Sequence, residues 1–311
     1  MSRTVWVDQR DNPVRPDGSL DRPYQTIQTA IDAAAAKTPA PSAANPVTIA
    51  ILQGVYAENV VVRTDGLCLR GFGGVATIKP AQGPALVVSN ASATAVQQYI
   101  SSGDPQALQG SSVKGKSPRS LQLFDVNLET KDAGPAAVYI AGDPKGEPVG
   151  DGEIVFNRCR IVPASGKALN AYFTHYIHFR DSSEVYGATD ILNCVAVWVD
   201  DTMMVDFTLT WNSKHALSVP KAPGTGTAAQ FGLVGYHAFF VGGTVTLQND
   251  VAEKVWQPTV DSTFFQLDIR GNNRFEMVGG TVTTLNVDAT ANWKGTNVCV
   301  QQSGTYIPPA P

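Results

Sequence analysis

The sequence predicts an all-β solenoid, a single elongated domain of short stacked strands with an α-helix at its N-terminal end. A helix is expected at about 24–36, because the apolar residues of this segment share one face: Ile27, Ala30, Ile31 and Ala34. A strand and turn follow at 47–56, and further short strands come after them. A stack of strands exposes unpaired backbone and apolar core at its first coil, so we expect the helix to cap that end.

The composition is also that of one long domain. The 311 residues are 43% hydrophobic and only 16% charged, and 28 Gly and 20 Pro supply many turns. Such a chain can bury an extended core and lacks the composition of a disordered chain. We therefore expect residues 1–305 to form a single β-helix domain.

Similar strings recur along the chain and suggest the length of one coil. Phe156, Phe179 and Phe207 end three similar apolar triplets, and they are 23 and 28 positions apart. The string Val-Gly-Gly-Thr-Val-Thr occurs at 241–246 and again at 278–283, which is 37 positions later. Both spacings predict one coil per repeat, the second with a longer excursion, and glycine at a fixed place predicts a sharp corner.

Three segments depart from this pattern. Residues 91–119 are rich in Ser, Gln and Gly and predict an inserted loop with one short helix around 95–100. Residues 213–228 contain several Pro and Gly and predict a protruding loop, and 306–311 predict an extended Pro-rich tail. Loops of this size on a rigid scaffold often make functional contacts.

Charge, hydropathy and cysteine spacing exclude several classes of protein. A net charge of −4 offers no basic field for nucleic acid, and no apolar run approaches a membrane span. The first residues contain no run of signal-peptide length, so we expect synthesis in the cytoplasm. The four cysteines lie far apart and predict buried free thiols, with no zinc site and no disulfide framework: Cys68, Cys159, Cys194 and Cys299.

No metal or cofactor is expected, although three groups of side chains were candidates. Asp200 and Asp201, with Asp206 nearby, could bind Ca²⁺, but adjacent strand residues point to opposite faces, which favours a solvated pair. His175 and His178 have an odd spacing and for the same reason should not share a metal. The last group favours Asx turns over a Ca²⁺ loop: Asp8, Asp11, Asp17 and Asp21.

The order of the N-terminal elements, with segments 67–73 and 76–78 after the first strand, resembles the beginning of right-handed parallel β-helices of the pectin methylesterase and pectate lyase superfamily. Segments 156–159, 179–181 and 187–190 are also similar to the Phe-x-x-Cys, Phe-Arg-Asp and Gly-x-x-Asp pattern of the esterases. The resemblance implies a right-handed, single-stranded parallel β-helix. It also implies a mechanism with two Asp residues, one as nucleophile and one as acid and base, assisted by an Arg and by Gln side chains that stabilise the oxyanion.

Within this resemblance, only one catalytic position is retained. Asp190 falls where one catalytic Asp would be, whereas Ala168 occupies the position of the other and Lys167 that of a preceding Gln. Gly134 or Pro135 replaces the second Gln, and no counterpart of the Arg is present near 209–212. A lone Asp cannot be both nucleophile and acid, so the sequence predicts a non-enzymatic protein in which Asp190 is a structural turn residue.

The function expected from these observations is that of a structural protein of a phage virion. Residues 4–8 look like the start of β-helices found in phage tailspikes and other virion components, and cytoplasmic synthesis fits assembly before lysis. The helix begins near Tyr24, which leaves no room for a tailspike anchor domain, so a head decoration or cement protein is favoured. The expected partners are the major capsid protein, other virion subunits and further copies of the chain, with a trimer suggested by analogous β-helices.

Two alternatives remain open at this point. The first is a carbohydrate-active enzyme, an esterase or lyase acting on a surface polysaccharide, with these candidate residues: Asp190, Arg180, Asp181 and His178. The second is a tailspike-like glycan-binding protein, in which exposed rings would stack on sugars, with these candidates: Trp198, Trp211, Trp256 and Trp293. Solvent exposure of the rings discriminates between binding and ordinary core packing.

Overall fold

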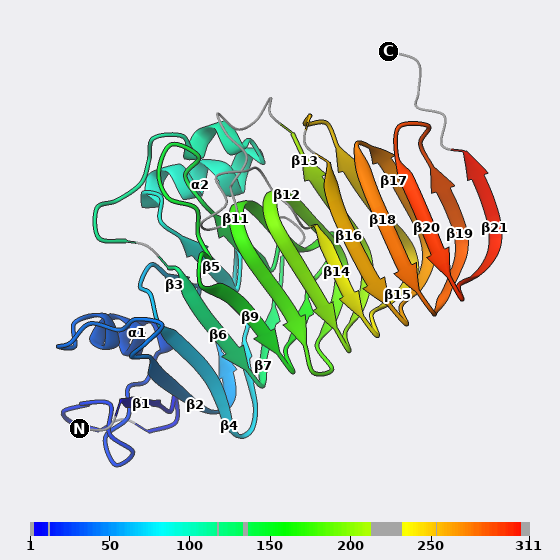
Figure 1. Cartoon of the computed structure of the whole chain (residues 1–311). Helices are drawn as coiled ribbons and strands as arrows, with labels where there is room; N and C mark the ends of the chain where they lie inside the picture. The colour runs from blue at the N-terminus through cyan, green and yellow to red at the C-terminus, as the bar shows by residue number, and fades with distance from the viewer. Residues whose placement is uncertain are drawn as a thin grey trace.

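The computed structural model describes residues 3–11, 13–116, 118–132, 136–212, 232–252 and 254–305. The predicted protruding loop at 213–228 and the predicted tail at 306–311 lie outside the described residues. Within them the chain is mostly β, and 21 strands join in one long parallel sheet that winds up the molecule (Figure 1). This architecture fits the parallel β-helix that the sequence predicts.

The strands alternate with short turns, and the helices lie near the N-terminal half. The helices are α1 (Ile27–Ala35), α2 (Ala93–Ser102) and the 3₁₀ helix η1 (Pro105–Leu108). The strands of the N-terminal half are β1 (Thr4–Val7), β2 (Val47–Tyr56), β3 (Val60–Val62), β4 (Leu67–Ile78), β5 (Leu86–Ser89), β6 (Ser120–Phe124), β7 (Val126–Glu129), β8 (Val138–Ala141), β9 (Glu153–Asn157) and β10 (Arg160–Val162). The remaining strands are β11 (Lys167–Arg180), β12 (Glu184–Asp200), β13 (Met203–Trp211), β14 (Leu233–Tyr236), β15 (Phe239–Asn249), β16 (Val255–Val260), β17 (Thr263–Gly271), β18 (Asn273–Val278), β19 (Thr281–Val287), β20 (Asn292–Thr296) and β21 (Cys299–Thr305).

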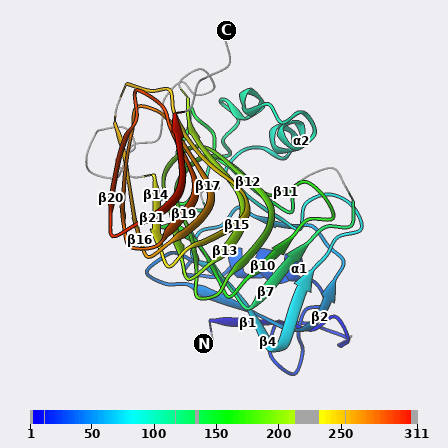
Figure 2. The ribbon, with the colours of Figure 1, turned by 90° about the vertical axis from the view of Figure 1, so that its right-hand side faces the viewer.

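Each coil passes through three strand positions, and each position pairs in register with the same position of the next coil. We name the resulting surfaces the first, second and third face. In one coil β9 lies in the first face, β10 in the second and residues 167–172 of β11 in the third. Longer strands such as β11 bend at a corner and continue from the third face into the first. Figure 2 shows the coils nested behind one another.

The corner between the first and second faces is built from residues with positive φ, one in most coils. These are Asp125, Arg158, Asp181, Asp201, His237, Asp261, Gly279 and Asn297, with φ between 45° and 70°. Asp and Asn tolerate this left-handed conformation better than most residues. The backbone N–H of most of these corner residues donates to the next coil, as from Asp201 to the Tyr236 carbonyl at 3.0 Å. The corner therefore continues the ladder of hydrogen bonds along the stack.

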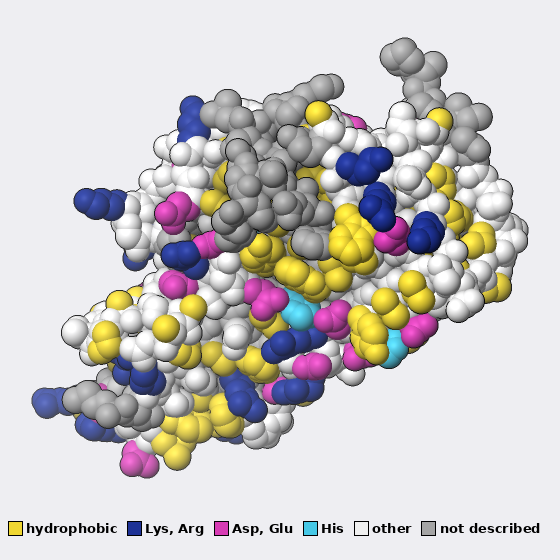
Figure 3. All heavy atoms as spheres, in the orientation of Figure 1, with side chains coloured by type: hydrophobic (Ala, Val, Ile, Leu, Met, Phe, Trp, Pro, Cys, Tyr) yellow, Lys and Arg dark blue, Asp and Glu magenta, His cyan; other side chains and the backbone are white. Residues whose placement is uncertain are grey.

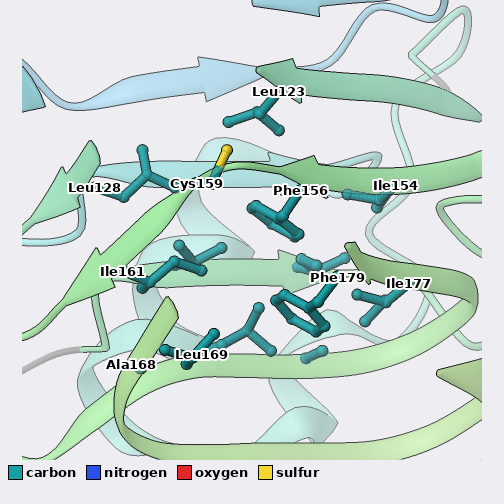
Figure 4. Packing of buried hydrophobic residues seen from close by; sticks show 14 of the residues in the cluster. Leu123, Leu128, Ile154, Phe156, Cys159, Ile161, Ala168, Leu169, Ile177 and Phe179 are labelled. Atoms are coloured by element: carbon teal, nitrogen blue, oxygen red, sulfur yellow. The ribbon is translucent and has the colours of Figure 1, made fainter. Parts of the chain in front are cut away.

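Apolar and aromatic side chains stack along the inside of the coils. Phe156 and Phe179 are fully buried and paired in register, with ring centroids 5.1 Å apart and planes 11° apart. Figure 4 shows these rings among neighbouring aliphatic side chains. The 23-residue spacing that the sequence suggests for this coil is therefore confirmed.

The other two predicted repeats are wrong. Phe179 pairs with Val199, whereas Phe207 lies in the third face opposite Thr189 and Val245. The two Val-Gly-Gly-Thr-Val-Thr strings also turn different corners, because Gly279 precedes the second face and 242–243 precede the third. Coil length varies along the chain, so similar sequence strings lie in different faces and at different corners of their coils.

Helix α1 lies against the first coil. Its N-cap Thr26 accepts a hydrogen bond from the Thr29 N–H at 3.2 Å, and the Glu58 carboxylate accepts the N–H groups of Ile27 and Gln28 at 2.7 and 2.9 Å. Burial raises the pKa of Glu58, although these hydrogen bonds oppose the shift. The Gln28 side chain also pairs with the N–H and carbonyl of Val61 on the edge of β3, at 2.8 and 3.3 Å. The buried face of the helix is the one that the sequence predicts: Ile27, Ala30, Ile31 and Ala34.

The segment 91–119 carries α2 and η1 and packs on the third face. Tyr99 of α2 donates its hydroxyl to Asn170 Oδ1 at 2.8 Å and is buried against Tyr139 and Tyr172. Burial raises the pKa of Tyr99. The insertion is thus held to the coils by a small core of its own.

No helix of the described residues is long and apolar enough to cross a membrane. All four cysteines are free thiols; Cys159 and Cys194 are buried, and burial raises the pKa of both to about 12. Cys68 is half-buried and Cys299 is exposed. The predicted burial of Cys299 is therefore wrong, because it lies on the outer side of β21, the last described strand of the stack.

Candidate functional site

His178 is the centre of a cluster of charges on the first face. It points outward from β11 because it alternates with the buried Ile177 and Phe179. Its Nδ1 lies 2.9 Å from Glu153 Oε1 of the preceding coil, and its Nε2 lies 2.7 Å from Asp200 Oδ2 of the following coil. Figure 3 shows acidic side chains around a histidine on this side of the molecule.

The charged state of His178 follows from these two contacts. Burial opposes the imidazolium, but hydrogen bonds and attraction from Asp200 and Glu153 outweigh it and raise the pKa of His178 to about 9. At neutral pH the ring is an imidazolium that donates from both nitrogens. The protonated ring has no free lone pair for general base catalysis. Its ion pairs with Glu153 and Asp200 join three consecutive coils.

Arg180 and Asp181 lie near this cluster but serve the corner of the coil. Asp181 is one of the corner residues with positive φ, and it accepts a hydrogen bond from the Asn157 side-chain amide. Arg180 Nε lies 3.8 Å from Asp181 Oδ2, which is a loose ion pair. Arg180 and Asp181 therefore have a structural role at the corner of the coil.

Asp190 lies on a different face from the other three candidates. It is paired with Asn170 and Thr208 in the third face, whereas His178 is paired with Val155 and Trp198 in the first. The prediction that Asp190 is a turn residue is wrong, because it lies within strand β12. The four candidate residues therefore do not form one site.

A pocket of about 310 Å³ adjoins Asp190 below α2. The lining residues include Tyr99, Asn170 and Thr208, and Asp190 is the only carboxylate among those that the structure describes. Lys167 Nζ lies 2.6 Å from Asp190 Oδ2. Lys167 therefore neutralises the charge of Asp190. A displacement that needs a nucleophile and a separate acid finds no second carboxylate among the described lining residues of this pocket.

The four candidate tryptophans differ in exposure. Trp211 is fully buried and donates its Nε1–H to the Cys194 carbonyl at 2.7 Å, and Trp293 is partly buried and stacked on Phe275. Trp256 is 37% exposed on the first face, and Trp198 is half-buried on the same face. Only the last two rings are presented outward for contact with a ligand.

Trp198 lies in an aromatic group beside the histidine cluster, and Trp256 lies two coils further along the same face. The ring of Trp198 lies 5.3 Å from that of Tyr176 and 6.0 Å from that of His178. Trp256 donates its Nε1–H to Glu276 Oε2 at 3.1 Å. Rings and carboxylates on one flat face can stack on sugar rings and accept their hydroxyl groups.

The other candidate side chains are engaged in local structure. Asp200 binds His178, Asp201 contacts His237 at 3.3 Å, and Asp206 accepts the Thr244 N–H at 2.8 Å. Within the described residues, no group of three His, Cys, Asp or Glu side chains is placed to hold a metal ion.

The N-terminal acidic segment and His175 also have local partners. Asp8 and Asp17 accept the N–H of the residue two positions later, as in Asx turns. A hydrogen bond from Arg10 holds the pKa of Asp8 below its usual value. His175 is nearly buried and lies 2.8 Å from Asp151, apart from the contacts of His178.

Sequence reasoning missed Glu153 and Asp200 as partners of His178, and Lys167 as the partner of Asp190. These contacts join different coils, and only the register between strands brings the residues together. Comparison with protein-family models finds no match, and comparison with curated proteins finds none either.

Proposed function

We propose that this chain is a non-enzymatic structural protein of a phage virion, which decorates the head by binding the major capsid protein and other virion subunits. The observation that carries the non-enzymatic part is the Lys167–Asp190 ion pair at 2.6 Å in a pocket whose described lining holds no second carboxylate. The virion part rests on the resemblance of 4–8 to the start of virion β-helices. We place the protein in the virion and include further copies of the chain among its partners.

The finer description of the fold belongs to this proposal. We infer a right-handed coil, because connections between parallel strands of one sheet are right-handed in about 98% of cases. We infer that α1 caps the stack, since its Gln28 satisfies the edge of β3 and its apolar face is buried against the first coil. A closed N-terminal end suits a protein that must not polymerise through its strand edges.

Particles from a lysate that contains this protein test the proposal. Mass spectrometry and cryo-electron microscopy should find the chain at high, symmetry-related copy number on the capsid. Finding it only as free protein would overturn the virion role. Hydrolysis of methylated pectin or bacterial polysaccharide that is lost in Asp190→Asn would overturn the non-enzymatic part and establish the carbohydrate-active alternative.

A glycan-binding role is the second candidate, and the outward rings of the first face favour it. Trp256 is 37% exposed, and Tyr176 and Trp198 lie 5.3 Å apart beside Glu153 and Asp200. Stacking of a sugar on an aromatic ring depends on such exposed faces.

Binding to an array of bacterial surface glycans tests this role. Trp256→Ala and Trp198→Ala should each reduce binding at least tenfold. Phe265→Ala is the matched control, because Phe265 is 51% exposed but lies after the second-face residue Phe264, away from the first face. Equal loss in the control, or no binding by the wild-type chain, would contradict the glycan-binding role.

A further inference from the structure

A groove of about 780 Å³ lies between helix α2 and the strands β3 and β5 of the third face. Helix α2 lies on the outer side of the coils (Figure 2) and forms one wall of the groove. None of the candidate site residues described above lines this groove. Buried or half-buried aliphatic side chains form its floor: Val61, Pro84, Val87, Val96 and Ile100.

Arg63 lines one end of the groove without a counter-ion. Its side chain lies on the same side of the extended chain as Val61, because the alternating Val60 and Val62 are buried in the core. Burial lowers the pKa of Arg63, and no neighbouring carboxylate opposes this shift. Within the described residues the guanidinium forms no ion pair, so it can bind a carboxylate.

Asp132 lies at the opposite end of the groove. Its Oδ2 accepts the Gly83 N–H at 3.0 Å, and the Asn59 side-chain amide donates to the carbonyl of Pro84 in the same turn at 2.7 Å. Asp132 Oδ1 is buried and has no hydrogen-bond partner in the described part of the chain. Asn59 and Arg63 are four residues apart on an extended chain, so the two ends are about 13 Å apart. The groove is therefore cationic at one end and anionic at the other.

An extended peptide fits this groove in length and in polarity. Side chains at i, i+2 and i+4 of an extended chain point to one side and span about 13 Å. An acidic, an aliphatic and a basic residue at these places meet the guanidinium, the floor and the carboxylate. Exposed polar side chains on the rim can bond to the peptide backbone: Gln82, Gln97 and Ser101. No aromatic ring is among the described lining residues, which disfavours a stacked sugar.

We propose that the groove between α2, β3 and β5 binds an extended peptide segment of a partner protein. An acidic residue of this segment binds Arg63, an aliphatic residue two positions away packs on the floor, and a basic residue four positions away binds Asp132. The inference goes beyond the proposed function and is tested on the purified chain alone. Its failure leaves the virion role untouched, and absence of the chain from particles leaves the peptide groove untouched.

An array of immobilised peptides is the first test. Peptides of the pattern acidic-x-aliphatic-x-basic, with x varied, should bind the purified full chain. Gln in place of either charged residue should weaken binding roughly tenfold, because charge-assisted hydrogen bonds are the strong ones. Peptides with the two charges only two residues apart should bind as weakly as these. Absence of binding, or equal binding by neutral peptides, overturns the proposal.

Substitution of the two end residues tests which charges meet. Arg63→Gln should bind the acidic peptide no better than its Gln counterpart, and Asp132→Asn should lose the preference for the basic residue in the same way. Asp132→Asn keeps an acceptor for the Gly83 N–H. The matched control is Arg70→Gln, an exposed arginine of the first face, which should leave binding unchanged. Undiminished preferences in the variants, or equal loss in the control, overturn the assignment.

A gain of binding tests the orientation without relying on a loss. Arg63→Glu should bind peptides that are basic at both ends at least roughly tenfold better than the wild-type chain does. Circular dichroism verifies that each variant is folded. The zwitterion 8-aminooctanoate should not displace a bound peptide at equal concentration, because it lacks a backbone for the polar rim. Equal displacement, or no gain by Arg63→Glu, overturns the peptide groove.

Discussion

Two regions of the first face use the alternation of strand residues in opposite ways. In β9 and β11 the inward side chains are apolar, as with Phe156 and Phe179, while the outward His178 takes part in a network of charges. In β14, β16 and β18 the outward Tyr236 and Val278 are exposed, while buried inward positions are polar: Gln257, Thr259 and Asn273. The same backbone geometry therefore carries an ordinary core in one region and a partly inverted one in the other.

The comparison shows that the inward positions of a stacked coil must be filled by side chains that fit one another, but that these side chains can be apolar or polar. Register requires that equivalent side chains fit one another, and a polar side chain fits inside when a neighbour satisfies it. Gln257 Oε1 accepts the Leu233 N–H at 3.0 Å, and its Nε2 donates to Asn273 Oδ1 at 2.6 Å. Outward, the ring of Tyr236 lies against that of its neighbour His237, with centroids 4.0 Å apart, and Val278 is 50% exposed.

The largest effect should come from the apolar interior. Phe179→Ala removes a fully buried ring that is stacked on Phe156, and it should lower the free energy of unfolding by about 3–5 kcal/mol. Phe265→Ala deletes the same group from an exposed site, and it should change monomer stability by less than about 0.5 kcal/mol. Urea denaturation of both variants measures the difference, and similar losses would break the contrast between the two regions.

Substitutions in the polar interior should change the free energy of unfolding by less, and a matched control should change it in the opposite direction. Gln257→Leu leaves the Leu233 N–H and Asn273 Oδ1 without their partner and should cost about 2 kcal/mol. Thr259 Oγ1 is buried without a hydrogen-bond partner, so Thr259→Val should be neutral or stabilise by about 1 kcal/mol. Urea denaturation compares the two, and destabilisation by Thr259→Val would show that its hydroxyl is satisfied.

The charged exterior should give an effect that depends on pH. The folded pKa of His178, about 9, lies above its ordinary value of 6.5, so its protonation stabilises the fold fully below about pH 6.5 and progressively less as pH rises through 9. His178→Gln should therefore cost on the order of 2 kcal/mol at about pH 6 and clearly less at about pH 10. Urea titrations at both values measure this difference, and a loss independent of pH would contradict the ion network.

Much of the fold could be predicted from local sequence. The apolar stripe from Ile27 to Ala34 predicts the buried face of α1, because helix periodicity is a local property. The similarity of the triplets ending in Phe156 and Phe179 predicts one coil, since no insertion separates these strands from their register. The spacing failed at Phe207, where the chain passes a corner and places the similar triplet in another face.

The candidate site could be predicted only as single residues. His178, Arg180 and Asp181 lie close in sequence and do share one region, whereas Asp190 lies on another face although it is only twelve positions from His178. Between these two residues the chain turns one corner at Asp181 and another between Val185 and Ala188, so Asp190 lies in the third face. The neutralising contacts come from other coils, and no local pattern announces them.

The sequence by itself determined a mostly β chain and the apolar face of its first helix, because these follow from periodicity and residue type. The tertiary structure decided which residues meet: Lys167 with Asp190, Glu153 and Asp200 with His178, and Tyr236 with Val260 and Val278. Coil length varies along the stack, so the register of hydrogen bonds between parallel strands, and not spacing in the chain, sets these neighbours.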